Sequence, residues 1–138
     1  MEAFVRCGHG IIVFPGGVGT AEEIFYLLAL LLHPSNAGQT IPLVFTAPQS
    51  SVHYFEMIDE FIALSLGENA RSLYKIIIDD PVSVAQSMSS LMSEVQAQRK
   101  KSKDAYFFNW SLTVPLALQQ PFTPSHENMA DLNLHADQ

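Results

Sequence analysis

The segment Ile11-Ile12-Val13-Phe14-Pro15-Gly16-Gly17-Val18-Gly19-Thr20 decides the fold of this 138-residue chain. Its first four residues are a short, continuous apolar run, which is typical of a strand buried on both faces of a parallel sheet. The run stops at Pro15, and three glycines then permit positive φ angles and a tight reversal. The apolar stretch that follows, from about Ala21 to Leu32, predicts a helix. The segment therefore predicts a strand, a glycine-rich turn and a helix in succession.

The same order of elements recurs twice downstream, with Gly67 closing one helix and Pro81 opening another. The further predicted elements are strands over 41–46 and 73–78 and helices over 2–6, 52–66 and 82–98. Strands that alternate with helices are the signature of a parallel sheet with helical crossovers. We therefore predict an α/β fold with a Rossmann-like parallel sheet. Three strands leave faces that doubly wound folds normally cover, so we expect the domain to be truncated on its N-terminal side.

The regular alternation ends near residue 100, which divides the chain into two parts. Residues 1–100 are predicted to form the later part of the Rossmann-like domain, and residues 101–138 an irregular extension that carries aromatic residues and prolines. The basic run from Arg99 to Lys103 is expected to be a solvated link between them. Four aromatic residues are expected to pack on something, because their exposure to water would be costly. They are Tyr106, Phe107, Phe108 and Trp110.

Composition narrows the classes of function. The formal net charge is −7, from 14 acidic and 7 basic side chains, which argues against a nucleic-acid-binding surface or an anchor to anionic membranes. The longest apolar run, Ile24 to Leu32, is too short to span a bilayer. The single cysteine excludes an internal disulfide, and no segment resembles a secretory leader, so we expect a cytoplasmic protein. A small anionic ligand is compatible with this negative net charge, because backbone N–H groups can hold a phosphate without any lysine.

The glycine-rich turn has the properties of a phosphate site. Gly16, Gly17 and Gly19 let the backbone approach an oxyanion closely, and the first N–H groups of the following helix point at it. The helix dipole adds positive charge there, and the Thr20 hydroxyl can donate a further hydrogen bond. Neither the Walker loop nor the dinucleotide fingerprint has this spacing. The alternative is a turn that serves the fold alone, with Thr20 and Glu23 forming a capping box.

Residues Pro15 to Glu23 reproduce the pattern PGGxGTxxE, in which six of nine positions are fixed. In this the chain resembles the Lonely Guy phosphoribohydrolases, a family long mislabelled as lysine decarboxylases. The resemblance covers most of the chain, from Met1 to Asp137, and extends to larger bacterial members in which this domain is flanked by additional segments. Three further segments show the same resemblance: Gly67-Glu68-Asn69-Ala70-Arg71, Phe108-Asn109-Trp110-Ser111 and Pro124-Ser125-His126-Glu127-Asn128-Met129.

The resemblance implies hydrolysis of the N-glycosidic bond of a nucleoside 5′-monophosphate, which gives a free base and ribose 5-phosphate. It implies that Glu23 binds the ribose hydroxyls and stabilises positive charge at the anomeric carbon. Glu22 is a candidate ligand contact, with a solvent-facing support of the helix start as the alternative. No metal and no organic cofactor is implied. By the same resemblance, the residues expected to hold the 5′-phosphate are Gly16, Gly17, Gly19 and Thr20.

One departure from the family limits this expectation. Family members carry an arginine upstream of the motif proline, at a position that falls before Met1 here, and the offset of Arg6 does not match it. We therefore expect the chain alone to have little or no nucleosidase activity. A non-catalytic nucleotide- or phosphate-binding module that contributes its loop to an oligomer is the alternative function. A gene fragment without a function of its own is a third.

Two further expectations concern packing. The predicted helix over 21–32 is apolar around its whole circumference, so it must be buried on two sides. One side can cover the sheet, and we expect the other to meet a second subunit in a homo-oligomer. Asp79 and Asp80 directly precede Pro81, and we expect them to cap a helix rather than to form a catalytic carboxylate pair.

Overall fold

The structure, a computed structural model, describes residues 2–105, 107–116 and 125. Its sheet has three strands in the order β1 (Ile11–Val13), β2 (Leu43–Ala47) and β3 (Lys75–Ile78). Both pairs are parallel, with Ile11 paired to Leu43 and Thr46 paired to Ile77. The predicted parallel sheet is confirmed.

Each predicted helix is present, although some bounds differ. The α-helices are α1 (Glu2–Cys7), α2 (Val18–Leu32), α3 (Val52–Leu66) and α4 (Pro81–Ser102), and the 3₁₀ turns are η1 (Pro34–Asn36), η2 (Gln49–Ser51) and η3 (Glu68–Leu73). Helix α2 begins at Val18 rather than near Ala21, so the last glycine of the loop lies in its first turn. Gly67 closes α3 with a φ of 87°, as its position predicted.

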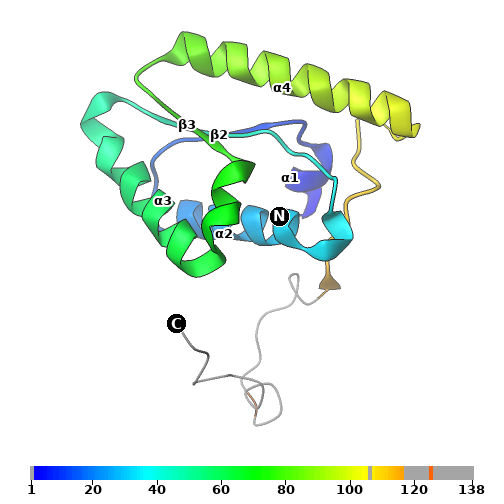
Figure 1. Cartoon of the computed structure of the whole chain (residues 1–138), viewed down its shortest axis with the longest axis horizontal. Coiled ribbons are helices and arrows are strands. Elements are labelled where there is room, and N and C mark those ends of the chain that lie inside the picture. Colours follow the sequence, from blue (N-terminus) through cyan, green and yellow to red (C-terminus); the bar gives the residue numbers. More distant parts are fainter. Residues whose placement is uncertain (1, 106, 117–124, 126–138) are drawn as a thin grey trace.

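The helices cover the two faces of the sheet unequally. In Figure 1, α4 lies on one side of the strands and α2 and α3 lie on the other. Because side chains alternate along a strand, β2 sends Phe45 into the larger core on the α2 and α3 side and Val44 into a smaller cluster with α4. The core side chains of α2 and α3 that contact Phe45 and its neighbours are Ile24, Leu27, Leu28, Phe55 and Ile62.

Helix α2 is buried mainly by its own chain. The core that contains Leu27 and Leu28 also includes Val5 of α1, Ala70 of η3 and Leu112 of the C-terminal segment. Distant parts of the same chain therefore cover much of the second side of this helix, and a homo-oligomer through it stays a prediction. No helix in the described part of the chain is both long and apolar enough to cross a membrane.

The C-terminal segment 107–116 packs differently from the expectation. Phe107 and Trp110 are exposed, and Phe108 lies against Trp110 with ring centroids 4.3 Å apart. The apolar side chains of the segment that reach the core are Leu112, which is buried, and Val114, which packs against it. Hydrogen bonds also hold the segment: Nη1 of Arg6 donates to the carbonyl oxygens of Asn109 and Leu112, both at 2.9 Å. Tyr106 lies outside the described residues.

The basic run is also placed differently. Arg99 is buried within the last turns of α4, which continues to Ser102. Most of this run is therefore helical rather than a link, although its lysines are exposed to solvent as predicted.

Candidate functional site at the carboxyl end of the first strand

The glycine loop follows β1 at its carboxyl end and leads directly into α2. Gly17 is the N-cap residue, with an extended backbone (φ −89°, ψ −159°) and no side chain capping the helix. Its carbonyl oxygen accepts from the N–H of Thr20 at 3.1 Å and from that of Ala21 at 3.3 Å. The N–H groups of Val18 and Gly19 precede these bonds, so they belong to the part of a helix that lacks backbone partners. They are donors for a ligand at the end of β1.

Two features that the sequence allowed in this loop are absent from it. Thr20 lies inside the first turn of α2 and is not its N-cap, so the capping box with Glu23 does not form. The reason is that the Gly17 carbonyl starts the helix further upstream. The glycines of the loop also have no positive φ, which among the described glycines is found only at Gly38 and Gly67. The backbone angles alone therefore do not require glycine in this loop.

The space around each glycine separates their roles. A Cβ at Gly16 would collide with the Thr20 side chain, which folds back over it, so the packing of the loop requires this glycine. A Cβ at Gly17 or Gly19 would meet nothing within 4 Å. Glycine in a helix is about 1 kcal/mol less favourable than alanine, and the fold gains no packing at Gly19 in return. Open space thus lies beside the free N–H groups.

Glu22 and Glu23 follow in the next turn of α2, and both are exposed. Residues three and four apart share one face of a helix, so Glu23 lies on the face of Gly19 and Thr20. Within the described residues, no hydrogen bond or ion pair engages either carboxylate. Glu23 is thus an unengaged carboxylate one turn from the free N–H groups, and Glu22 stands beside it.

A cavity of about 390 Å³ opens at the same edge of the sheet. The carboxyl ends of the three strands contribute to it through Phe14, Thr46 and Asp79, and α4 closes one side with Val84. Sequence reasoning missed this cavity, although Thr46 is a signal: it is the one polar residue in the strand Leu43–Ala47.

The two carboxylates after β3 have different roles. Asp80 caps α4 as predicted: it accepts from the backbone N–H of Ser83 at 2.9 Å and from its hydroxyl at 2.6 Å. These hydrogen bonds lower the pKa of Asp80 from its ordinary value. Asp79 does not take part in the cap. The prediction that both residues cap the helix is therefore confirmed for Asp80 and wrong for Asp79.

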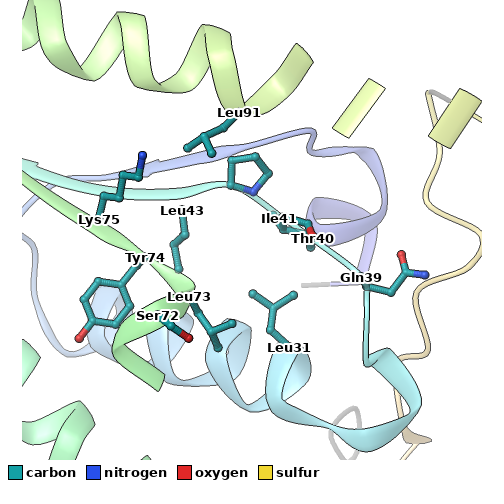
Figure 2. A pocket seen from close by; sticks show the side chains of 11 residues that line it. Leu31, Gln39, Thr40, Ile41, Leu43, Ser72, Leu73, Tyr74, Lys75 and Leu91 are labelled. Atoms are coloured by element: carbon teal, nitrogen blue, oxygen red, sulfur yellow. The ribbon is translucent and has the colours of Figure 1, made fainter. Parts of the chain in front are cut away.

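A second cavity, of about 250 Å³, lies at the opposite edge of the sheet. Figure 2 shows Leu31 of α2 and Leu91 of α4 approaching it from the two sides of the sheet. It is lined by the amino ends of β2 and β3 and contains none of the predicted site residues. Ligand crevices of open α/β sheets lie at the carboxyl edge, so this cavity is not the candidate site.

The sequence profile of the family described as "Possible lysine decarboxylase", the Lonely Guy family, matches residues 1–88. This range includes the whole sheet, the glycine loop and Glu23. The chain belongs to the Lonely Guy family. A second profile, described as "Pyrimidine/purine nucleotide monophosphate nucleosidase, C-terminal", matches residues 92–138.

Named relatives of this Lonely Guy chain point to one kind of protein. Pyrimidine/purine nucleotide 5′-monophosphate nucleosidases of Escherichia coli strains K12, O6:H1 and O157:H7 are each 55% identical to it over 138 residues. The matches cover 100% of this chain and 30% of each relative. The chain therefore spans about a third of the length of the curated relatives it matches.

Within this Lonely Guy domain, the structure brings together most of the predicted site. Gly16, Gly17, Gly19 and Thr20 form one turn, and the exposed Glu23 follows on the same helix face. Arg6 is not part of it, because its guanidinium donates to Glu2 at 2.7 Å and to the C-terminal segment. Arg6 therefore has a structural role. Its offset from the motif had predicted only that it does not match the family's arginine.

Proposed function

We propose that this chain supplies the phosphate- and ribose-binding part of an enzyme that hydrolyses nucleoside 5′-monophosphates. The proposal is supported by the names of its relatives and by the loop after β1. One observation carries it: the uncapped N–H groups at the start of α2 face open space beside Gly17 and Gly19, which the fold itself does not use. A phosphate bound there would be stabilised by the helix dipole and by hydrogen bonds from the backbone. Gly16 and the Thr20 hydroxyl complete this turn.

The proposed reaction breaks the bond between the anomeric carbon and the base. Water adds to that carbon, the electron pair of the C–N bond goes to the base nitrogen, and the base leaves in protonated form with ribose 5-phosphate as the other product. The transition state resembles an oxocarbenium ion, so a nearby carboxylate is favourable. We assign this carboxylate to Glu23, which also binds the ribose hydroxyls. No step requires a metal or an organic cofactor, and we place the reaction in the cytoplasm.

The phosphate site is tested by replacing Gly19 with Ala. The added methyl group would enter the space assigned to the phosphate, so we expect the affinity for ribose 5-phosphate to fall by about tenfold or more, equivalent to the loss of one charge-assisted hydrogen bond. The same change improves helix propensity, so the free energy of unfolding should stay equal or rise by up to about 1 kcal/mol. Calorimetric titration and urea unfolding measure the two effects.

The control is Val18→Ala, in the same turn of α2. Val18 is largely exposed, and its replacement adds no atom next to the N–H groups. Binding of ribose 5-phosphate should therefore stay within about twofold of wild type. Unchanged binding by Gly19→Ala would show that this loop only turns the chain, and the phosphate site would be withdrawn.

We further propose that the chain forms a homo-oligomer through α2 and its neighbour α3. Met57, Phe61 and Leu64 recur on one face of α3 and are exposed, at 71%, 56% and 80% respectively. Phe25 of α2 lies edge-on to Phe61, with ring centroids 5.0 Å apart, so the two helices share this apolar surface. Contiguous exposed apolar surfaces of this kind mark contacts with other proteins.

Phe61→Asp is expected to shift the oligomer toward monomer, because it places a charge in the middle of that surface. Sedimentation velocity at several concentrations measures the change. Val82→Asp is the control, since Val82 is similarly exposed but lies on α4, across the sheet. A wild-type chain that stays monomeric well above micromolar concentration would contradict the oligomer.

A further inference from the structure

The segment after α4 is bonded to both ends of the unit that carries the glycine loop. That unit runs from α1 through β1, the loop and α2 to the 3₁₀ turn η1. Figure 1 shows the segment leaving the end of α4 and running down past α1 and η1. Its two anchors are Arg6, in the last turn of α1, and Asn36, in η1. We call residues 109–113, which meet these anchors, the clamp.

At the first anchor, hydrogen bonds run in both directions between Arg6 and the clamp. Nη1 of Arg6 donates to the carbonyl oxygens of Asn109 and Leu112, and the Asn109 N–H donates to the Arg6 carbonyl at 2.8 Å. Oδ1 of the buried Asn109 accepts from the Leu112 N–H at 3.1 Å, which fixes the shape of the clamp. Hydrogen bonds from a charged donor are stronger than those between neutral groups, so α1 is firmly attached here.

At the second anchor, the Asn36 side chain binds the backbone of Thr113. Its Nδ2 donates to the Thr113 carbonyl at 2.8 Å, and its Oδ1 accepts from the Thr113 N–H at 2.7 Å. Nδ2 also donates to the carbonyl of Leu30 at 2.8 Å, near the end of α2. Between the two anchors, Leu112 enters the core that also contains Val5 of α1. The clamp thus joins the start of the loop-carrying unit to its end.

The glycine loop has few contacts of its own that fix its position. A Cβ at Gly17 or Gly19 would meet nothing within 4 Å, and Val18 between them is 87% exposed. In the described part of the chain, β1 pairs only with β2. The position of the free N–H groups therefore depends on the elements on either side of the loop. Donors of a binding site must be held within about 0.5 Å of the productive geometry, so a small shift of β1 or α2 changes the site.

We propose that the clamp positions the glycine loop for the phosphate, with Arg6 as the positioning residue on the N-terminal side. The inference rests on the proposed function, which places the phosphate at this loop. It gives a role to the region that the second sequence profile matches, because the clamp lies within residues 92–138 and the unit that it holds lies within residues 1–88. The anchors act from a distance: α2 has 15 residues, so its first turn lies about 20 Å from the turn that contains Asn36.

Arg6→Met tests the clamp, because it removes the donor of the first anchor and keeps a long side chain on α1. We expect the affinity for ribose 5-phosphate, measured by calorimetric titration, to fall by about fivefold. In the unliganded chain, the nuclear magnetic resonance signals of the Gly17 and Gly19 amides should shift. Arg6→Lys offers one compact ammonium in place of a fork of donors, so it should change both readouts in the same direction by less. This milder variant decides the question should Arg6→Met not fold.

Two control variants separate positioning from a general loss of stability. Glu2→Ala removes the ion pair of Arg6 with Glu2, at 2.7 Å, but leaves the bonds of Arg6 to the clamp. Ile62→Val removes a methylene group from the buried core side of α3, which lowers stability without touching either anchor. Both variants should bind ribose 5-phosphate within about twofold of wild type and leave the amide signals of the loop in place.

The outcomes distinguish this inference from the proposed function. If wild type binds ribose 5-phosphate and the Arg6 variants bind it equally well with unmoved loop signals, the clamp serves the fold alone and the proposed function stands. The inference is also wrong if Ile62→Val weakens binding as much as Arg6→Met does, because loss of stability would then explain both. If wild type itself does not bind ribose 5-phosphate, the proposed function fails, and the positioning of a phosphate by the clamp fails with it.

Discussion

Replacing Glu23 by Gln is expected to slow the hydrolysis of nucleoside 5′-monophosphates by about 10²–10³-fold, the range found when one group that stabilises transition-state charge is removed. Gln keeps the size of the side chain and its capacity for hydrogen bonds to the ribose, but it lacks the negative charge that opposes the developing oxocarbenium ion. Because Glu23 is exposed and engages no described residue, the substitution should not disturb the fold. Binding of ribose 5-phosphate should stay close to wild type.

The measurement is release of free base from AMP or CMP, in an Escherichia coli nucleosidase whose matching segment is replaced by residues 1–138 of this chain. At 55% identity the exchange should preserve the packing of the domain. Glu22→Gln is the matched control: it makes the same change one residue earlier and should keep activity within a few-fold of wild type. A Glu23→Gln enzyme as fast as wild type would remove Glu23 from the reaction. A chimera that binds nucleotides without hydrolysing them, even with Glu23 present, would favour the non-catalytic binding module.

The strands and helices could be predicted because their signals are local. The apolar run from Ile11, the glycine that ends α3 and the proline that begins α4 each act within a few residues. The start of α2 was placed too late because three glycines within four residues are typical of a turn. In the structure the Gly17 carbonyl accepts from Thr20 and Ala21, so the helix begins within the motif.

The parts that could not be predicted depend on contacts between distant residues. Sequence patterns do not show that Leu112 enters the core beside α2. Nor do they show that the Arg6 guanidinium donates hydrogen bonds to the carbonyl oxygens of Asn109 and Leu112. For the same reason the sequence did not show how much of α2 is covered by its own chain. The candidate site shows the same difference. The loop and Glu23 could be predicted because they form one local motif, whereas Thr46 and Asp79 line one cavity only because parallel strands end at the same edge of the sheet.

The largest expected loss of stability is for Asn36→Ala, in the turn after α2. Asn36 is 1% exposed, and its side chain makes three hydrogen bonds: Nδ2 donates to the carbonyls of Leu30 and Thr113, both at 2.8 Å, and Oδ1 accepts from the Thr113 N–H at 2.7 Å. Alanine would remove the partners of the Thr113 N–H and carbonyl, and the Leu30 carbonyl would keep only the N–H of His33, at 3.3 Å. We expect the free energy of unfolding to fall by about 2–4 kcal/mol, since each buried group left unpaired costs about 1–3 kcal/mol.

Urea unfolding should show this loss as a midpoint lower by about 1–2 M, and hydrogen exchange should show faster exchange of the Thr113 amide. Asn36→Asp should be at least as damaging, because it keeps the acceptor for Thr113 but turns a carboxylate toward two carbonyl oxygens. Ser35→Ala is the control, since Ser35 is exposed and its hydroxyl bonds to no described residue. If Asn36→Ala were as mild as Ser35→Ala, segment 107–116 would be held to the domain by Arg6 and the buried Leu112, and the Asn36 side chain would add little to that attachment.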